Sequence, residues 1–177
     1  MGSDDSGALT HIDARGRASM VDVGDKPVTR RDAVCRAFVS MSTSTLDAIL
    51  SGSVDKGEVL AVARVAGIMA AKRTGELIPL CHPIGLDTIS VRFAPLRQPC
   101  GLVVEAHARV QAKTGVEMEA MMAVSTAALT IYDMCKGRDR GMSIDGVHLA
   151  HKSGGRSGEF DHPSSPGPEV GDGVDWL

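Results

Sequence analysis

Aspartate and lysine residues near the end of an expected helix have the spacing of proton-transfer groups. Asp133 and Lys136 are three residues apart, so their side chains share one helix face. A surface ion pair would explain this spacing without any function. However, the helix dipole opposes an aspartate in the last turn, which leaves an acid–base role open. Lys56 precedes Gly57 and is either an exposed turn lysine or a group whose backbone can approach a ligand.

Two glutamates at the start of the same expected helix are further candidates. Thr114 and Glu117 have the spacing of a capping box, which would explain Glu117 structurally. Glu117 also falls on the buried stripe of the helix, so a functional role stays open. Glu119 has no such structural explanation.

The segment Pro79-Leu80-Cys81-His82-Pro83 is rigid and extended because of its two prolines. His82 in this segment could donate a proton or a hydrogen bond. Cys81 in an apolar setting is more often an inert packing group, and no second pair of ligands has metal-site spacing. We therefore expect no metal bound by protein ligands.

Basic residues complete the set of candidates. Lys72 and Arg73 lie near a helix C-terminus, where cations are favoured in any case. Arg73 also continues an apolar stripe, and a buried guanidinium would need a glutamate or a phosphate as its partner. The Gly- and Ser-rich segment from Lys152 to Gly158 either binds phosphates through backbone N–H groups or is a flexible tail. Together these residues predict a pocket for an anionic substrate that undergoes proton transfers.

The composition limits the class of protein that carries these residues. A length of 177 residues predicts one domain, and 43% apolar with 23% charged residues is ordinary globular usage. Three Phe, one Tyr and one Trp are too few for base stacking, so we expect no nucleic-acid partner. No apolar run is long enough to span a membrane, and the four cysteines form no CxxC pair. A cytoplasmic location is expected.

The two ends of the chain differ from its middle. Residues 1–19 are polar and Gly-rich, and residues 154–177 are rich in Gly, Ser and Pro with acidic residues. We expect a flexible N-terminus at 1–19, a single catalytic domain at 20–153 and a disordered acidic tail at 154–177.

Several changes of apolar periodicity occur between these ends. They predict strands at 33–41, 88–93, 102–112 and 142–152, and helices at 42–50, 58–77 and from Thr114 to about Lys136. This order predicts an α+β fold, the ferredoxin-like split βαβ, with helices packed on a four-stranded antiparallel sheet. The last helix has no charge from Ala120 to Tyr132, and a single sheet covers only one of its sides. We therefore expect a homo-oligomer that uses this helix.

Seven segments in one order resemble the MoaC family, the cyclic pyranopterin monophosphate synthases of molybdenum cofactor biosynthesis, over roughly residues 10–158. They are Met20-Val21-Asp22-Val23, Lys56-Gly57-Glu58-Val59, Ala66-Gly67-Ile68 with Ala71-Lys72-Arg73-Thr74, Leu77-Ile78-Pro79-Leu80-Cys81-His82-Pro83, Thr114-Gly115-Val116-Glu117-Met118-Glu119-Ala120, Leu129-Thr130-Ile131-Tyr132-Asp133-Met134-Cys135-Lys136 and Lys152-Ser153-Gly154-Gly155.

The resemblance implies a ferredoxin-like hexamer, built as a trimer of dimers, with active sites at subunit interfaces. It implies conversion of 3′,8-cyclo-7,8-dihydro-GTP, a cyclised GTP, into cyclic pyranopterin monophosphate with release of diphosphate. No cofactor is then required, although Mg²⁺ could bind the substrate phosphates. The competing class is a non-catalytic oligomer that binds a nucleotide or a pterin as a regulatory module.

The resemblance also implies roles for individual residues. Asp133 would be the catalytic acid–base residue, with Lys56 and Lys136 beside it. The substrate would contact Leu80, Cys81, His82, Glu117, Met118 and Glu119, and its triphosphate would face Arg31, Lys72, Arg73 and Lys152. Glu58 departs from the family, which more often has Asp or Asn there, and the pair Arg30-Arg31 leaves open which arginine faces the site.

Overall fold

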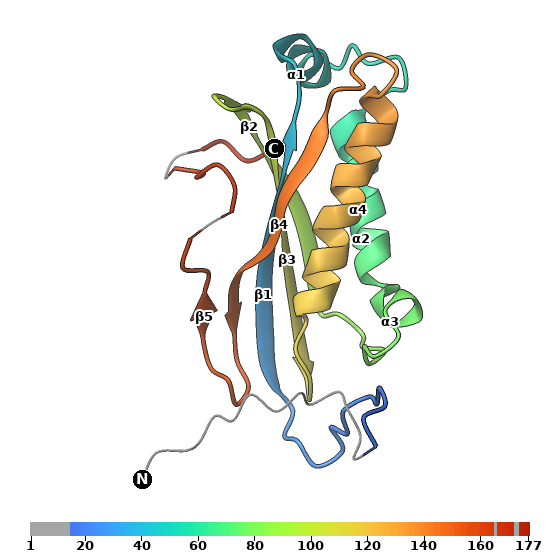
Figure 1. Ribbon diagram of the computed structural model, residues 1–177, viewed down its shortest axis with the longest axis vertical. Coiled ribbons are helices and arrows are strands. Elements are labelled where there is room, and N and C mark those ends of the chain that lie inside the picture. The colour runs from blue at the N-terminus through green and yellow to red at the C-terminus, as the bar shows by residue number, and fades with distance from the viewer. Residues whose placement is uncertain (1–14, 165, 172–173) are drawn as a thin grey trace.

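The computed structural model describes residues 15–164, 166–171 and 174–177 of the chain. Most of the N-terminal segment expected to be flexible lies outside these residues. A single antiparallel sheet has helices against one face (Figure 1). The elements in chain order are β1 (Thr29–Ser40), α1 (Thr43–Leu50), α2 (Val59–Ala71), α3 (Thr74–Leu77), β2 (Thr88–Arg97), β3 (Cys100–Ala112), α4 (Glu117–Cys135), β4 (Ser143–Ser153) and β5 (Phe160–Asp161).

The sheet confirms the α+β class and the antiparallel pairing, but it has five strands rather than four. Its strand order is β2-β3-β1-β4-β5, with every neighbouring pair antiparallel. The extra strand β5 pairs only Asp161 and Phe160 with His151 and Lys152. A two-residue strand is too short for an alternating pattern, so the sequence gives no signal for it.

Apolar residues that alternate along the central strands face the helices and form the main core. In β1, Ala33, Cys35 and Val39 are completely buried. From α4, Ala120, Val124, Ala127, Ala128 and Ile131 are completely buried in the same cluster. The small residues of this set allow α4 to lie close to the sheet, so the position of α4 is fixed along its whole length.

The single helix predicted at 58–77 is wrong, because the structure divides it into α2 and α3 at Lys72-Arg73. Arg73 is exposed, so its guanidinium needs no buried anionic partner. The face of α2 that packs on α4 consists of small residues and valine, namely Val59, Ala63, Gly67 and Ala71. The larger Val62 and Met69 are consequently turned outward and are 46% and 50% exposed.

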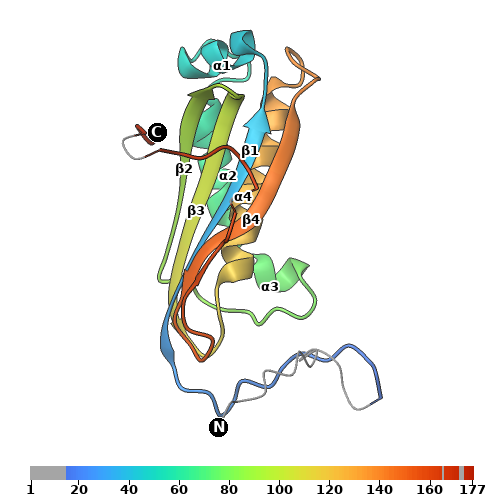
Figure 2. The same ribbon diagram turned by 60° about the vertical axis from the view of Figure 1, so that its left-hand side comes forward.

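The C-terminal tail lies on the face of the sheet opposite the helices (Figure 2). Val170, Val174 and Trp176 pack against a second buried cluster of Phe38, Ala94 and Val103. The flexibility expected for residues 154–177 stays a prediction, but the described part of the tail has defined contacts. Among the described residues, no helix is long and apolar enough to cross a bilayer.

Gly67 sets how closely α2 approaches α4, which gives a test of this packing. A Cβ at position 67 would lie 2.8 Å from the carbonyl oxygen of Ala123. We therefore expect Gly67→Ala to destabilise the fold by about 1–3 kcal/mol, because the backbone of α4 has to move. The measurement is urea unfolding followed by circular dichroism. Gly85→Ala is the control, since a Cβ there meets nothing within 4 Å, and equal stability of the two variants would contradict the prediction.

Candidate functional site

The residues predicted to form one site lie in two groups at opposite ends of α4 (Figure 1). Glu117 and Glu119 are in the first turn, and Asp133 is in the last turn. At 1.5 Å of rise per residue, Glu119 and Asp133 are separated by about 20 Å along the helix axis. One small substrate cannot contact both groups within a single chain.

The first group is the lysine–aspartate cluster, which consists of Lys56, Asp133 and Lys136. Lys136 Nζ lies 2.7 Å from Asp133 Oδ1, and Lys56 Nζ lies 3.1 Å from Asp133 Oδ2. Lys56 also donates a hydrogen bond of 2.8 Å to the backbone oxygen of Asp133. The turn before α2 makes this reach possible, because Gly57 has a φ of 91°, which suits glycine.

Asp133 is about half exposed in this chain, and its two lysine partners determine its ionisation. Its pKa is lowered first by the hydrogen bond from Lys136 and then by that from Lys56. The pKa of Lys136 is raised by the same hydrogen bond. The cluster therefore presents an ionised carboxylate between two ammonium groups, an arrangement that can accept a proton and neutralise a phosphate.

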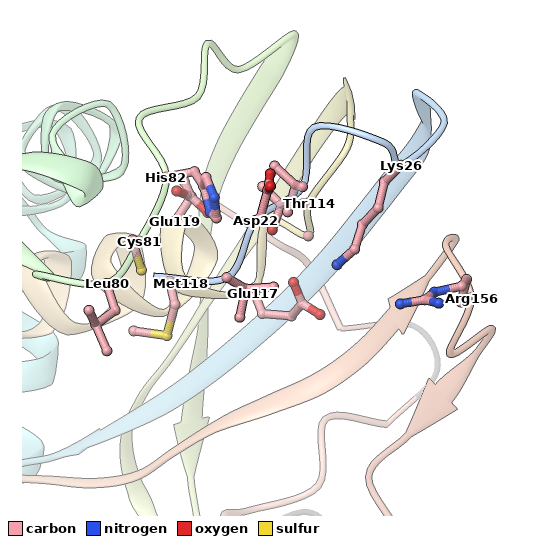
Figure 3. A pocket seen from close by; sticks show the side chains of 13 residues that line it. Asp22, Lys26, Leu80, Cys81, His82, Thr114, Glu117, Met118, Glu119 and Arg156 are labelled. Atoms are coloured by element: carbon pink, nitrogen blue, oxygen red, sulfur yellow. The ribbon is translucent and has the colours of Figure 1, made fainter. Parts of the chain in front are cut away.

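The second group lines a cavity of about 410 Å³, which we call the carboxylate pocket (Figure 3). It brings together the predicted residues Leu80, Cys81, His82, Glu117, Met118 and Glu119. Its wall also contains residues that were not predicted to contact substrate, namely Val21, Asp22, Val23, Lys26, Thr114, Gly115 and Arg156. Figure 3 shows His82 and Glu119 toward one side, Lys26 and Arg156 toward the other, and Glu117 between them.

The segment that carries His82 makes a close backbone contact with α3. A Cβ at Gly75 would lie 2.9 Å from Pro83 Cα, so only glycine lets α3 approach this segment. The segment is not extended throughout, contrary to the expectation from its prolines, because it turns at Pro79-Leu80, where the Cys81 N–H donates to the Ile78 oxygen at 3.0 Å. Burial, and then the charge of Glu119, raises the pKa of the Cys81 thiol, which favours an unreactive thiol.

Glu119 is the most buried carboxylate of the pocket, with 3% of its surface exposed. Burial raises its pKa to about 7, and the negative charge of Glu117 acts in the same direction. A carboxyl group that titrates near neutral pH can both donate and accept a proton during a reaction cycle. Glu119 is therefore the candidate acid–base residue of the carboxylate pocket.

Glu117 does not form the predicted capping box. Val116 is the N-cap of α4 and makes no side-chain cap bond, and Glu117 is the first helical residue. Its carboxylate lies 3.2 Å from Lys152 Nζ, and this lysine also donates to Ser157 Oγ at 3.0 Å. The capping-box prediction is therefore wrong, and Glu117 lines the pocket and pairs with Lys152 instead.

A second cavity of about 650 Å³ adjoins the first and shares Lys26, Thr114, Gly115 and Arg156 with it. We call it the cationic pocket, because Lys26, Arg31, Lys113 and Arg156 all line it. Arg156 belongs to the segment 152–158, for which the sequence left phosphate binding open. No motif in the sequence indicated Lys26 or Lys113 as site residues. Four cations in one cavity suit an anion with several charges.

Arg31, rather than Arg30, faces this cavity. Its guanidinium lies directly over Gly155, where any side chain would overlap it. Its Nε atom is buried without a partner among the described residues. Successive strand residues point to opposite faces of the sheet, so Arg30 points away from this cavity. On that other face, Arg30 Nε donates a hydrogen bond of 2.8 Å to Asp32 Oδ2.

The remaining predicted residues are less central. Lys72 lines an adjoining cavity of about 270 Å³ together with Glu119, whereas Arg73 is exposed at the start of α3. Within the described parts of the chain, no three His, Cys, Asp or Glu side chains are grouped so as to hold a metal ion.

The fold and the two pockets define an α+β protein in which a cavity lined by four cations adjoins a cavity lined by carboxylates. The chain belongs to the MoaC family, whose model matches residues 20–155. It is 60% identical to the cyclic pyranopterin monophosphate synthase of Chloroflexus aurantiacus over 155 residues, 88% of this chain and 95% of the relative. It is similarly 60% identical to the synthase of Pelotomaculum thermopropionicum over 153 residues, 86% of this chain and 90% of the relative. Identity to cyclic pyranopterin monophosphate synthase 1 of Mycobacterium bovis is 56% over 158 residues, 89% of this chain and 92% of the relative.

The raised pKa of Glu119 predicts how stability depends on pH. Because its folded pKa of about 7 exceeds its ordinary value of 4.5, the folded chain holds this proton more tightly than the unfolded chain. The resulting stability is complete below pH 4.5 and is lost as pH rises through 7. We expect the wild type to lose on the order of 3 kcal/mol relative to Glu119→Gln across this window.

The measurement is urea unfolding of both proteins at several pH values. Glu76→Gln, at an exposed position, is the control and should follow the wild type. Parallel pH profiles of wild type and Glu119→Gln would show that Glu119 titrates normally.

Proposed function

We propose that this chain is a cyclic pyranopterin monophosphate synthase, which converts 3′,8-cyclo-7,8-dihydro-GTP into cyclic pyranopterin monophosphate and diphosphate. The observation that carries the proposal is the direct contact between the carboxylate pocket and the cationic pocket, which share Lys26 and Arg156. A substrate with a polyphosphate on one side and a ring system that exchanges protons on the other needs these two environments side by side. The names of the relatives support the same reaction.

The two pockets suggest a division of roles. Glu119, with a pKa of about 7, and His82 would exchange protons with the ring system. Leu80 and Met118 would contact its apolar surface. Arg31 and the other cations of the cationic pocket would stabilise the charge that develops on the departing diphosphate. Lys152, which does not line this pocket but bonds Glu117 and Ser157 at its border, would add to this charge.

The site is complete only with a second copy of the chain. Asp133 lies about 20 Å from Glu119 along α4, and Lys56 is paired with Asp133, so both would meet the carboxylate pocket of a neighbouring subunit. Outward-facing apolar side chains on α2 and α4 support assembly through the helix layer, namely Val62, Val65, Met69 and Leu129. We propose a homo-oligomer, a hexamer built as a trimer of dimers, with active sites between subunits.

Further features of the proposal concern topology, cofactors and location. The order β2-β3-β1-β4 with two crossing helical segments supports a ferredoxin-like split βαβ, to which β5 adds an edge strand. The protein would need no cofactor, and a Mg²⁺ ion would be held by the substrate phosphates rather than by a protein cage. Free cysteines at 35, 81, 100 and 135 agree with a reducing cytoplasm.

Asp133→Asn tests the catalytic role of the lysine–aspartate cluster. We expect turnover to fall at least about a hundredfold, because the amide cannot exchange a proton, while assembly is retained. The assay supplies the cyclised GTP in situ from the upstream radical enzyme and follows diphosphate release. Asp47→Asn, which removes an exposed carboxylate paired with Arg97 at 2.6 Å, is the control. Near wild-type turnover of Asp133→Asn would reject its role, and wild-type binding without turnover would indicate a regulatory module.

Complementation between two inactive variants tests the composite site. Asp133→Asn and Glu119→Gln are each expected to be inactive alone. When they are co-expressed in equal amounts, about a quarter of the sites in a randomly assembled two-fold dimer combine two intact halves. Activity should therefore return to about a quarter of the wild-type value. If the mixture stays inactive although mixed oligomers are isolated, all catalytic groups of a site come from one chain.

A further inference from the structure

β2 lies at the edge of the sheet, and some of its backbone N–H and C=O groups point away from β3. These groups are protected at Val91, Phe93 and Pro95, each in a different way. The carbonyl of Val91 accepts a hydrogen bond of 3.0 Å from Arg64 Nε. At position 95, proline has no N–H to offer. Between them, Phe93 donates to the oxygen of Leu177 at 3.2 Å and accepts from its N–H at 2.8 Å. Phe93 is thus a strand-pairing position, and the last residue of the chain occupies it.

The outer face of the sheet next to this edge is built to receive the rest of the tail. Phe38, Ala94 and Val103 form an apolar patch that is 6% exposed or less. Val170, Val174 and Trp176 pack on this patch. We call residues 166–171 and 174–177 the C-terminal strap. Figure 2 shows it crossing the sheet from β4 to β2.

An arginine fixed by a buried carboxylate anchors the strap. Glu105 is 3% exposed and is held by Arg36 Nε at 2.8 Å and by Arg92 Nε at 2.6 Å. This pairing fixes the planar guanidinium of Arg92, whose central carbon lies 4.0 Å from the centre of the Trp176 ring. A flat cation over an aromatic face is a favourable contact that orients the indole. Backbone hydrogen bonds at Phe93, apolar packing on the patch and the contact of Arg92 with Trp176 therefore hold the strap on the sheet.

We propose that the C-terminal strap is a detachable strand ligand that shields the edge of β2 from a second copy of this chain. Open edges with unpaired backbone groups are templates for pairing with other chains. The edge at Phe93 is self-complementary in antiparallel pairing about a two-fold axis, so the partner that it would take is another β2. The strap lies outside residues 20–155, so this shield is an addition to the part that matches the MoaC family.

Val174→Asp in the full-length protein tests the proposal, because it places a charge against the apolar patch without changing the domain itself. Gly171→Asp is the matched control, since this position is exposed and a Cβ there meets nothing within 4 Å. Trp176 is the only tryptophan, so its fluorescence reports directly on the strap. We expect Val174→Asp to increase quenching of Trp176 by acrylamide and to speed hydrogen exchange of the Phe93 amide by about tenfold or more.

Light scattering then measures whether the released edge associates. Val174→Asp should form species of larger mass than the wild type, and Gly171→Asp should not. A variant lacking Leu177 removes only the pairing at Phe93, and it should show the same faster exchange. Unchanged Trp176 quenching and Phe93 exchange in Val174→Asp would show that the strap is not docked. A released strap without any increase in mass would show that it does not shield the edge.

Discussion

The close approach of α2 to α4 is the constraint on which the remaining structure depends. Gly67 faces the backbone of α4, so the two helices form one rigid layer against the sheet. Because α4 is rigid over 19 residues, it fixes the distance between the carboxylates at its start and the lysine–aspartate cluster at its end. The packing of α2 on α4 also turns the larger side chains of α2 outward, where they are exposed. The proposed division of the site between two chains rests on this packing.

The charges at the two ends of α4 are compensated in different ways. The helix dipole favours Glu117 and Glu119 at the N-terminus, so burial is the main cause of the raised pKa of Glu119. At the other end the dipole opposes Asp133, and two lysines keep its carboxylate ionised. The same helix thus holds one carboxyl group with a raised pKa and one with a lowered pKa.

The sequence predicts the fold more completely than the site. Alternating residues such as Ala33, Cys35 and Val39 identify β1, because one side of that strand is buried. The spacing of Thr114 and Glu117 suggests a capping box, but Lys152, which is distant in the sequence, takes the carboxylate instead. Local patterns cannot reveal such partners. Lys26 and Lys113 likewise are identified as pocket residues only from the folded structure. The separation of Asp133 from Glu119 was readable from their positions on one helix, whereas β5 and the C-terminal strap have no local pattern.

The pairing of Leu177 with Phe93 has a practical consequence for how the protein is produced. The final residue uses its own N–H and carbonyl oxygen on the sheet edge. Any affinity tag fused after Leu177 would extend from that edge and compete for the same backbone groups. A tag before residue 1 adds no residue next to Leu177. Preparations that differ only in the end carrying the tag are therefore not equivalent samples for measuring oligomeric state.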